Sequence, residues 1–145
     1  VLFRSVYVSR GGNTKKLADA IAKGAGSSAV SVKQYHGDTS ETSDILFVGA
    51  SIYAGRIDRT MNDFLKSLKP EQVKSVVVFG TSAGNKTALP QIKAILEANG
   101  IMVSDDEFHC KGAFLFANRG RPNDGDLEQA EAFAGRISGN NGSPK

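Results

Sequence analysis

Runs of consecutive apolar residues alternate with amphipathic stretches along almost the whole chain. Residues 1–8, 45–50 and 76–79 form the three clearest apolar runs, each of a length suited to a strand. Strands that are apolar on both faces are typical of a parallel sheet covered by helices on both sides. Parallel strands also need crossover connections, and the intervening stretches have helical spacing. The alternation therefore predicts a doubly wound α/β fold with a five-stranded parallel sheet.

The remaining elements follow from local patterns. Apolar residues at helical spacing predict three helices, and alternation of apolar and polar residues predicts an outer strand. The last strand is expected either as one strand or as a split pair. A final helix is expected with Asp126 as its N-cap. In chain order these expectations are a helix over 17–25, a strand over 30–35, helices over 61–68 and 89–96, strand residues 101–103 and 107–116, and a helix over 126–137.

Composition narrows the classes of function. The 145 residues fit one domain, expected over 1–137, followed by a flexible tail over 138–145 that is rich in Gly, Asn and Ser. No apolar run is long enough to suggest a membrane span, and a cytoplasmic location is expected. Cys110 is the only cysteine, so neither an internal disulfide nor a zinc site is expected. The net charge of +3 is scattered, which argues against nucleic-acid binding.

The first loop with chemical character follows the first apolar run. Ser9, Gly11, Gly12 and Thr14 lie between a predicted strand and a predicted helix. Adjacent glycines let a backbone wrap closely around a small group, and amides at a helix start attract an anion. This loop alone is compatible with a phosphate cradle or with a plain turn. It matches neither the phosphate loop of ATP-binding proteins nor the GxGxxG fingerprint.

Two more loops follow apolar strands. Residues 51–56 contain Tyr53, whose ring can stack on a flat ligand, and residues 80–85 are small and polar. Ligands of doubly wound sheets bind beyond the carboxyl ends of the strands, where the strand order reverses. We therefore expect all three loops to meet at one place. The combination suits a ligand with one phosphate and one flat polar ring.

The loops together resemble those of the flavodoxin family, over nearly the whole chain up to about Ile137. The family's phosphate loop has the form (T/S)-x-(T/S)-G-x-T, and Ser9, Gly12 and Thr14 match it whereas Gly11 departs from it. Residues 48–55 resemble the first flavin-flanking loop, and residues 79–84 the second. The chain lacks the long insertion of the larger flavodoxins.

The resemblance implies a flavodoxin-like three-layer sandwich with strand order 2-1-3-4-5. It also implies one non-covalent FMN and the function of a low-potential one-electron carrier between redox partners. Flavodoxins commonly flip a Gly-containing peptide next to the flavin, here Ala54–Gly55 or Gly55–Arg56. By this resemblance the cofactor-binding residues are Ser9, Arg10, Gly11, Gly12, Asn13, Thr14, Ser51, Ile52, Tyr53, Ala54, Gly55, Thr81, Ser82, Ala83, Gly84 and Asn85.

Two features depart from the family. The chain has no Trp, so Tyr53 is the only obvious stacking residue. Flavodoxins are usually acidic, whereas this chain is basic, with Arg56, Arg59 and Lys86 near the expected ring site. The charge predicts a redox partner with an acidic docking face. A monomer is expected, as for many small electron carriers.

Other functions are compatible with parts of the pattern. A flavodoxin-like FMN oxidoreductase, of the quinone reductase or protoporphyrinogen dehydrogenase type, is the main alternative, and Arg119 and Arg121 could then face an anionic substrate. A flavin-free regulatory module or a small phosphatase is disfavoured, because the first loop has neither an acid pair nor a cysteine. His109 and Cys110 are expected to be structural.

Overall fold

The computed structural model describes residues 3–8, 12–35, 42–53, 55–82, 87–112 and 120–139. Its strands are β1 (Phe3–Tyr7), β2 (Ala29–Ser31), β3 (Ser43–Tyr53), β4 (Arg56–Ile57), β5 (Val73–Ser82) and β6 (Met102–Lys111). Its helices are α1 (Asn13–Ala25), α2 (Arg59–Ser67), α3 (Leu89–Ala98) and α4 (Asp124–Ser138).

The sheet has the predicted parallel core. Its order is β2-β1-β3-β5-β6, and each of these neighbouring pairs is parallel. This confirms the order 2-1-3-4-5 once the short β4 is left aside. The addition is β4, which pairs antiparallel with the end of β3 through Ile52 and Tyr53. Since β5 occupies one side of β3 as far as Ile52, β4 takes the other side, where β1 has already ended.

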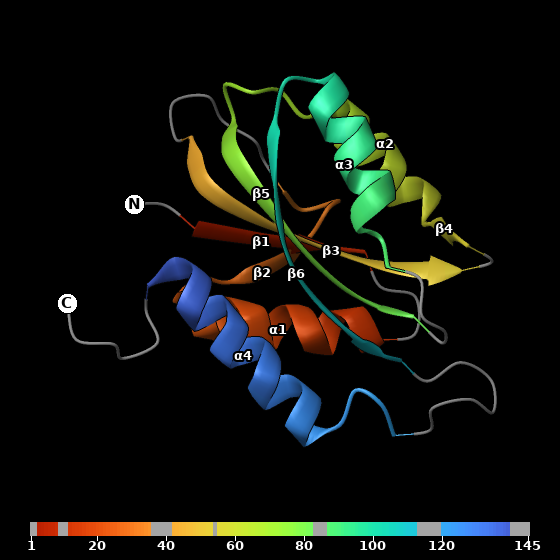
Figure 1. Cartoon of the computed structure of the whole chain (residues 1–145), viewed down its shortest axis with the longest axis vertical. Helices are drawn as coiled ribbons and strands as arrows, with labels where there is room; N and C mark the ends of the chain where they lie inside the picture. Colours follow the sequence, from red (N-terminus) through yellow and green to blue (C-terminus); the bar gives the residue numbers. More distant parts are fainter. Residues whose placement is uncertain are drawn as a thin grey trace.

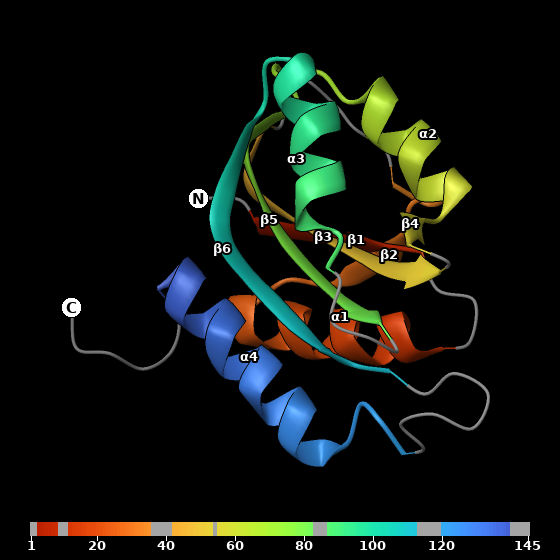
Figure 2. The ribbon, with the colours of Figure 1, turned by 45° about the vertical axis from the view of Figure 1, so that its right-hand side comes forward.

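Two helices cover each face of the sheet. Figures 1 and 2 show α1 and α4 on one face, and α2 and α3 on the other. Alternate residues of the central strands enter opposite cores, because successive side chains of a strand point to opposite faces. Phe47 and Phe79 pack with α1 and α4, whereas Val48 and Val78 pack with α2 and α3.

Both central strands extend further than the sequence analysis predicted. Ser51–Thr81 and Ile52–Ser82 are paired positions, so the beginnings of the second and third loops belong to β3 and β5. Two parallel strands that leave the core together can continue their ladder, and each satisfies the backbone groups of the other. The expectation of loop structure at residues 51–53 and 80–82 was therefore wrong.

The bounds of the outer strand and of the last strand also differ from the prediction. The outer strand β2 ends at Ser31, because its partner β1 ends at Tyr7 and the chain then turns, with the Gln34 amide donating to the Ser31 carbonyl at 2.9 Å. Over its described residues the last strand is one strand with an irregularity, since Val76 pairs with Val103 but Val78 pairs with Glu107. Residues 113–116 of the expected strand lie outside the described residues.

The start of α4 also differs from the prediction. Asn123, and not Asp126, is the N-cap, and its side chain accepts from the Asp126 amide at 2.9 Å. Asp126 completes the capping box by accepting from the Asn123 amide at 2.8 Å. An acid three residues after the cap is the usual partner in such a box.

Candidate functional site

Three buried hydroxyl groups meet where α1, β3 and β5 approach one another. The Ser51 Oγ lies 3.0 Å from the Thr81 Oγ1, and the Thr14 Oγ1 lies 3.4 Å from the Thr81 Oγ1. Thr14 and Ser51 are also directly hydrogen-bonded. We call Thr14, Ser51 and Thr81 the hydroxyl triad. Each of the three predicted loop regions contributes one member, so the structure brings the regions together as the sequence analysis expected.

The start of α1 lies beside the hydroxyl triad. Gly12 is the N-cap and has a φ of 85°, a left-handed conformation that favours glycine. A Cβ added at Gly12 would meet no atom within 4 Å, so the space beside its backbone is open. The first turn of α1 contains no acidic residue, and it includes Lys15 and Lys16. The positive end of the helix dipole therefore has no neighbouring negative side chain in that turn.

A second polar cluster lies on the other face of β5 and β6. The Ser82 Oγ is 2.8 Å from the His109 Nε2, and the Thr87 hydroxyl donates to the Glu107 Oε1 at 3.2 Å. Burial and, to a lesser extent, Lys111 lower the pKa of His109, whereas burial raises the pKa of Glu107. Both effects favour the neutral form of the His109 imidazole.

Gln91, which the sequence analysis did not single out, links α3 to the turn between β3 and β4. Its Nε2 donates to the Gly55 carbonyl at 2.8 Å, and its Oε1 accepts from the Ile57 amide at 3.1 Å. Gly55 has a φ of 79°. No pattern in the sequence marks Gln91, because a lone glutamine at a helix start is ordinary surface composition.

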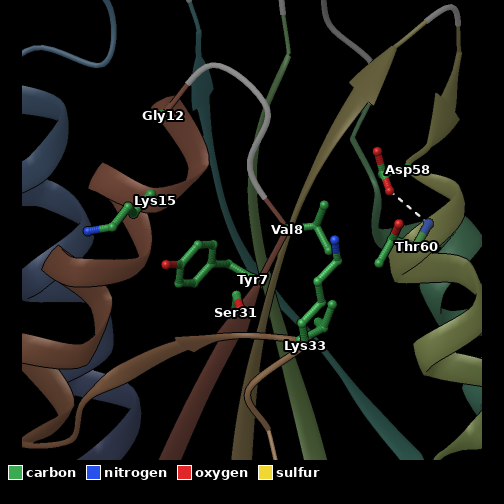
Figure 3. Close-up of a pocket in the computed structure, with 9 residues that line it drawn as sticks. Tyr7, Val8, Gly12, Lys15, Ser31, Lys33, Asp58 and Thr60 are labelled. Carbon is green, nitrogen blue, oxygen red and sulfur yellow. Dashed lines mark hydrogen bonds between the residues drawn. The ribbon is translucent and has the colours of Figure 1, made fainter.

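A cavity of about 470 Å³ opens on the other side of Gly12, between the starts of α1 and α2 (Figure 3). Lys15 and Lys33 bring positive charge to it, and the Lys15 ammonium pairs with Asp19 at 3.2 Å. The Asp58 carboxylate at its α2 side accepts from the Thr60 amide at 2.7 Å. The described residues that line it are Tyr7, Val8, Gly12, Lys15, Ser31, Val32, Lys33, Asp58 and Thr60.

The other predicted site residues fall into two groups. Asn13 is the first residue of α1, Ile52 lies near the end of β3, and Ser82 ends β5. The remaining predicted residues, with the side chain of Tyr53 and also Lys86, lie outside the described residues: Ser9, Arg10, Gly11, Ala54, Ala83, Gly84 and Asn85.

The surroundings of Arg121 and Cys110 suit structural roles for both residues. The Arg121 guanidinium binds both carboxylate oxygens of Asp126, at 2.5 and 2.7 Å, and it is therefore engaged at the start of α4. Burial, with a smaller contribution from Asp126, raises the pKa of Cys110 to about 11. A thiol with so high a pKa is a poor nucleophile at neutral pH, which agrees with the predicted structural role.

Neither a metal-binding cluster nor a membrane-length apolar helix is present in the part of the chain that the structure describes. No group of three or more His, Cys, Asp or Glu residues there could hold a metal ion. No described helix is long and apolar enough to cross a membrane.

Comparison with known proteins gives one family and one fold. A family model described as a flavodoxin domain matches residues 5–118. An uncharacterized protein of Methanocaldococcus jannaschii is 24% identical, with 94% of this chain and 95% of that protein covered. The structure of a flavodoxin from the domain Archaea aligns with a TM-score of 0.73 and 22% identity, over 96% of this chain and 97% of that one.

Two other solved structures share the fold. Two-electron reduced Megasphaera elsdenii flavodoxin aligns with a TM-score of 0.67 and 20% identity, over 93% of this chain and 99% of that one. The Flv1 flavodiiron core from Synechocystis sp. aligns with a TM-score of 0.70 and 20% identity, and the match covers 96% of this chain but 35% of the longer protein.

Proposed function

The chain belongs to the flavodoxin domain family, and on that premise we propose that it binds one FMN and carries single electrons at low potential between redox proteins. The FMN-binding unit extends over residues 1–137, with 138–145 as its tail. The cofactor is held by the residues of the three loop regions named from the sequence. The electron-transfer chemistry belongs to the flavin, and the protein supplies binding, orientation and electrostatics.

The hydroxyl triad is the observation that carries this proposal. Ser51 and Thr81 are 6% and 3% exposed, and Thr14 is 1% exposed. Buried hydroxyls on three separate elements, at the positive end of a helix, form a donor set suited to a phosphate monoester. We propose that Thr14, Ser51 and Thr81 exchange hydrogen bonds among themselves for bonds to the FMN phosphate, together with the backbone amides from Gly12 onward.

The ring of FMN is assigned to the loops that follow β3 and β5. Of the described residues, Ile52 and Gly55 in the first region and Ser82 in the second are assigned to the ring, whereas Ser51 and Thr81 are assigned to the phosphate. Their positions at adjacent strand ends support this assignment, because parallel strands β3 and β5 are paired up to Ile52 and Ser82. Small side chains and glycine at these ends allow a flat ring to approach the backbone.

The electron-carrier proposal is favoured over a substrate-specific FMN oxidoreductase. Arg121 was the described residue that an anionic substrate would have used, and its guanidinium is engaged with Asp126. Arg56 and Arg59 are exposed beside the β3–β4 turn, and the chain has a net charge of +3. We propose that the monomer docks on a redox partner through this basic surface, and that the partner presents acidic groups.

The proposal is tested by titrating purified, flavin-free protein with FMN in a calorimeter and by following the visible absorption of the bound flavin. A Thr14→Val variant keeps the size of the side chain and removes one hydroxyl. It should bind FMN about 10- to 100-fold more weakly, because a hydrogen bond to a charged group contributes about 1.5–3 kcal/mol.

Thr42→Val is the matched control. Thr42 lies at the opposite end of β3, where its hydroxyl donates to the Glu71 carbonyl at 2.7 Å. This variant should bind FMN as the wild type does. Wild-type protein that ignores FMN, or a Thr14→Val variant with wild-type affinity, would contradict the proposal.

A further inference from the structure

The side chain of Gln91 holds both backbone groups that flank Arg56. The Gly55 carbonyl accepts from Nε2 at 2.8 Å, and the Ile57 amide donates to Oε1 at 3.1 Å. The two bonds join α3 to the turn between β3 and β4, across 36 and 34 residues of sequence. One side chain therefore determines how this turn sits against the helix.

The chemistry of the partners allows only one orientation of the Gln91 amide. A carbonyl can only accept a hydrogen bond, and a backbone amide can only donate one. The NH₂ group of Gln91 must therefore face Gly55, and its oxygen must face Ile57. The bond to Nε2 fixes the direction of the Gly55 carbonyl, and with it the plane of the Gly55–Arg56 peptide.

Gly55 is also the residue at which this peptide can turn most easily. Its φ of 79° lies in the left-handed region, and glycine has no Cβ to hinder rotation into other regions. Gly55 is half-buried and Arg56 is exposed, so no tight packing of their side chains holds the peptide in place. The hydrogen bond from Gln91 opposes rotation of the Gly55 carbonyl, and the pairing of Arg56 with Tyr53 holds the other side of the same peptide.

We infer that Gln91 is a positioning residue that keeps the Gly55 carbonyl directed toward α3, and that it thereby sets the midpoint potential of the bound flavin. This inference rests on the proposed function, which places the β3–β4 turn at the flavin ring. It assigns the movable peptide to Gly55–Arg56. Gln91 itself is expected to make no contact with the flavin.

The expected direction of the change in midpoint potential follows from the proton that accompanies the electron. If FMN were bound there, uptake of one electron from a redox partner and one proton from water would give its ring a new N–H donor. A backbone carbonyl that is free to turn can accept from that new N–H. Because the hydrogen bond from Gln91 keeps the Gly55 carbonyl directed toward α3, this bond opposes the first one-electron reduction of the flavin. Release of the carbonyl should raise the first midpoint potential, by about 59 mV for each tenfold gain in relative affinity for the reduced form.

Two substitutions of Gln91 distinguish the effect of its hydrogen bonds on the midpoint potential from the effect of charge. Gln91→Met removes both bonds without adding charge, and Gln91→Glu keeps the acceptor for Ile57 but cannot donate to Gly55. Gln91→Met should raise the first midpoint potential of the FMN-loaded protein in a spectroelectrochemical titration. Gln91→Glu should raise it less, because its carboxylate opposes the uptake of an electron. Gln129→Glu on the exposed surface of α4, away from the turn, should leave the potential unchanged.

Amide hydrogen exchange of the flavin-free protein gives a second readout. Exchange at Ile57 should be faster in Gln91→Met than in the wild type, and close to wild type in Gln91→Glu. If both FMN-loaded variants keep the wild-type potential, or if Ile57 exchange is the same in all three proteins, the inference is wrong while FMN binding stands. Failure of wild-type protein to bind FMN would instead overturn the proposed function. If Gln91→Met does not fold, Gln91→Leu, which also removes both hydrogen bonds without adding charge, decides the inference by its potential.

Discussion

The helix pairs on the two faces of the sheet are held together by different means. On one face α1 and α4 are in close contact, and a Cβ added at Gly24 would lie 2.1 Å from the Glu131 carbonyl oxygen. On the other face Asn99, at the end of α3, donates through Nδ2 to the Leu65 and Leu68 carbonyls of α2 at 3.1 and 3.2 Å. Close backbone packing therefore joins the first pair, whereas an amide side chain bridges the second.

This difference bears on the proposed FMN site. The helix α1 carries Thr14 and the proposed phosphate site, and its tight contact with α4 leaves little freedom for it to move. The β3–β4 turn, in contrast, depends on the two hydrogen bonds of Gln91. We expect the phosphate end of the site to be rigid, and the turn at the ring end to be adjustable by a single substitution.

The largest expected effect comes from breaking the close contact on the α1–α4 face. Gly24→Val places a branched side chain where the Glu131 carbonyl and the Ala134 methyl lie. The helices must separate, and we expect the free energy of unfolding to fall by about 3 kcal/mol. Urea denaturation measures this change.

Ala132→Val is the control for valine in a helix, because Ala132 is exposed on α4. It should cost less than about 1 kcal/mol. Equal stabilities of the two variants would show that the α1–α4 contact is not tight at Gly24.

The next effect concerns the start of α4. Asp126→Asn removes the charge that binds Arg121 at 2.5 Å, and the free energy of unfolding at neutral pH should fall by about 2 kcal/mol. The hydrogen bond from Arg121 holds the pKa of Asp126 below its ordinary value. Its carboxylate therefore stabilises the fold above about pH 4, and this contribution is lost as the pH falls through the lower pKa of the folded state.

Thermal unfolding as a function of pH measures this effect. When the pH is lowered from neutral to acidic, the Asp126→Asn variant should lose less stability than the wild type does. Asp124→Asn, at an exposed position in the same helical turn, should keep the wild-type dependence. Identical pH profiles for wild type and Asp126→Asn would mean that packing alone holds α4 in place.

The smallest effect is expected on the α2–α3 face. Asn99→Ala removes the donor to the carbonyl groups at the end of α2, and should lower the free energy of unfolding by about 1 kcal/mol. Asn99→Asp preserves the shape but places an acceptor against carbonyl oxygens, so it should be at least as destabilising. Chemical denaturation of both variants tests the bridge, and wild-type stability of Asn99→Asp would contradict it.

The sequence was sufficient for the order of elements and for the general place of the site. Apolar strands such as residues 45–50 and 76–79 can be buried only in a sheet covered on both faces, so α/β alternation follows from burial alone. The matching residues Gly12 and Thr14 indicated the loop at the start of α1. These signals are local, and each can be recognised without knowing what packs against it.

Contacts between distant segments were decided by the tertiary structure. The continuation of β3 and β5 depends on their pairing with each other, and the role of Asp126 depends on a partner at Arg121 and a cap at Asn123. Gln91 has no signal of its own, because its function arises from atoms of Gly55 and Ile57 that only the fold brings within reach. The amino-acid sequence by itself determined which segments are buried and in which order the helices and strands follow, since both are set by hydrophobicity and its period along the chain. Which polar groups satisfy one another was decided only in three dimensions, because a hydrogen bond depends on distance and direction that residue type does not specify.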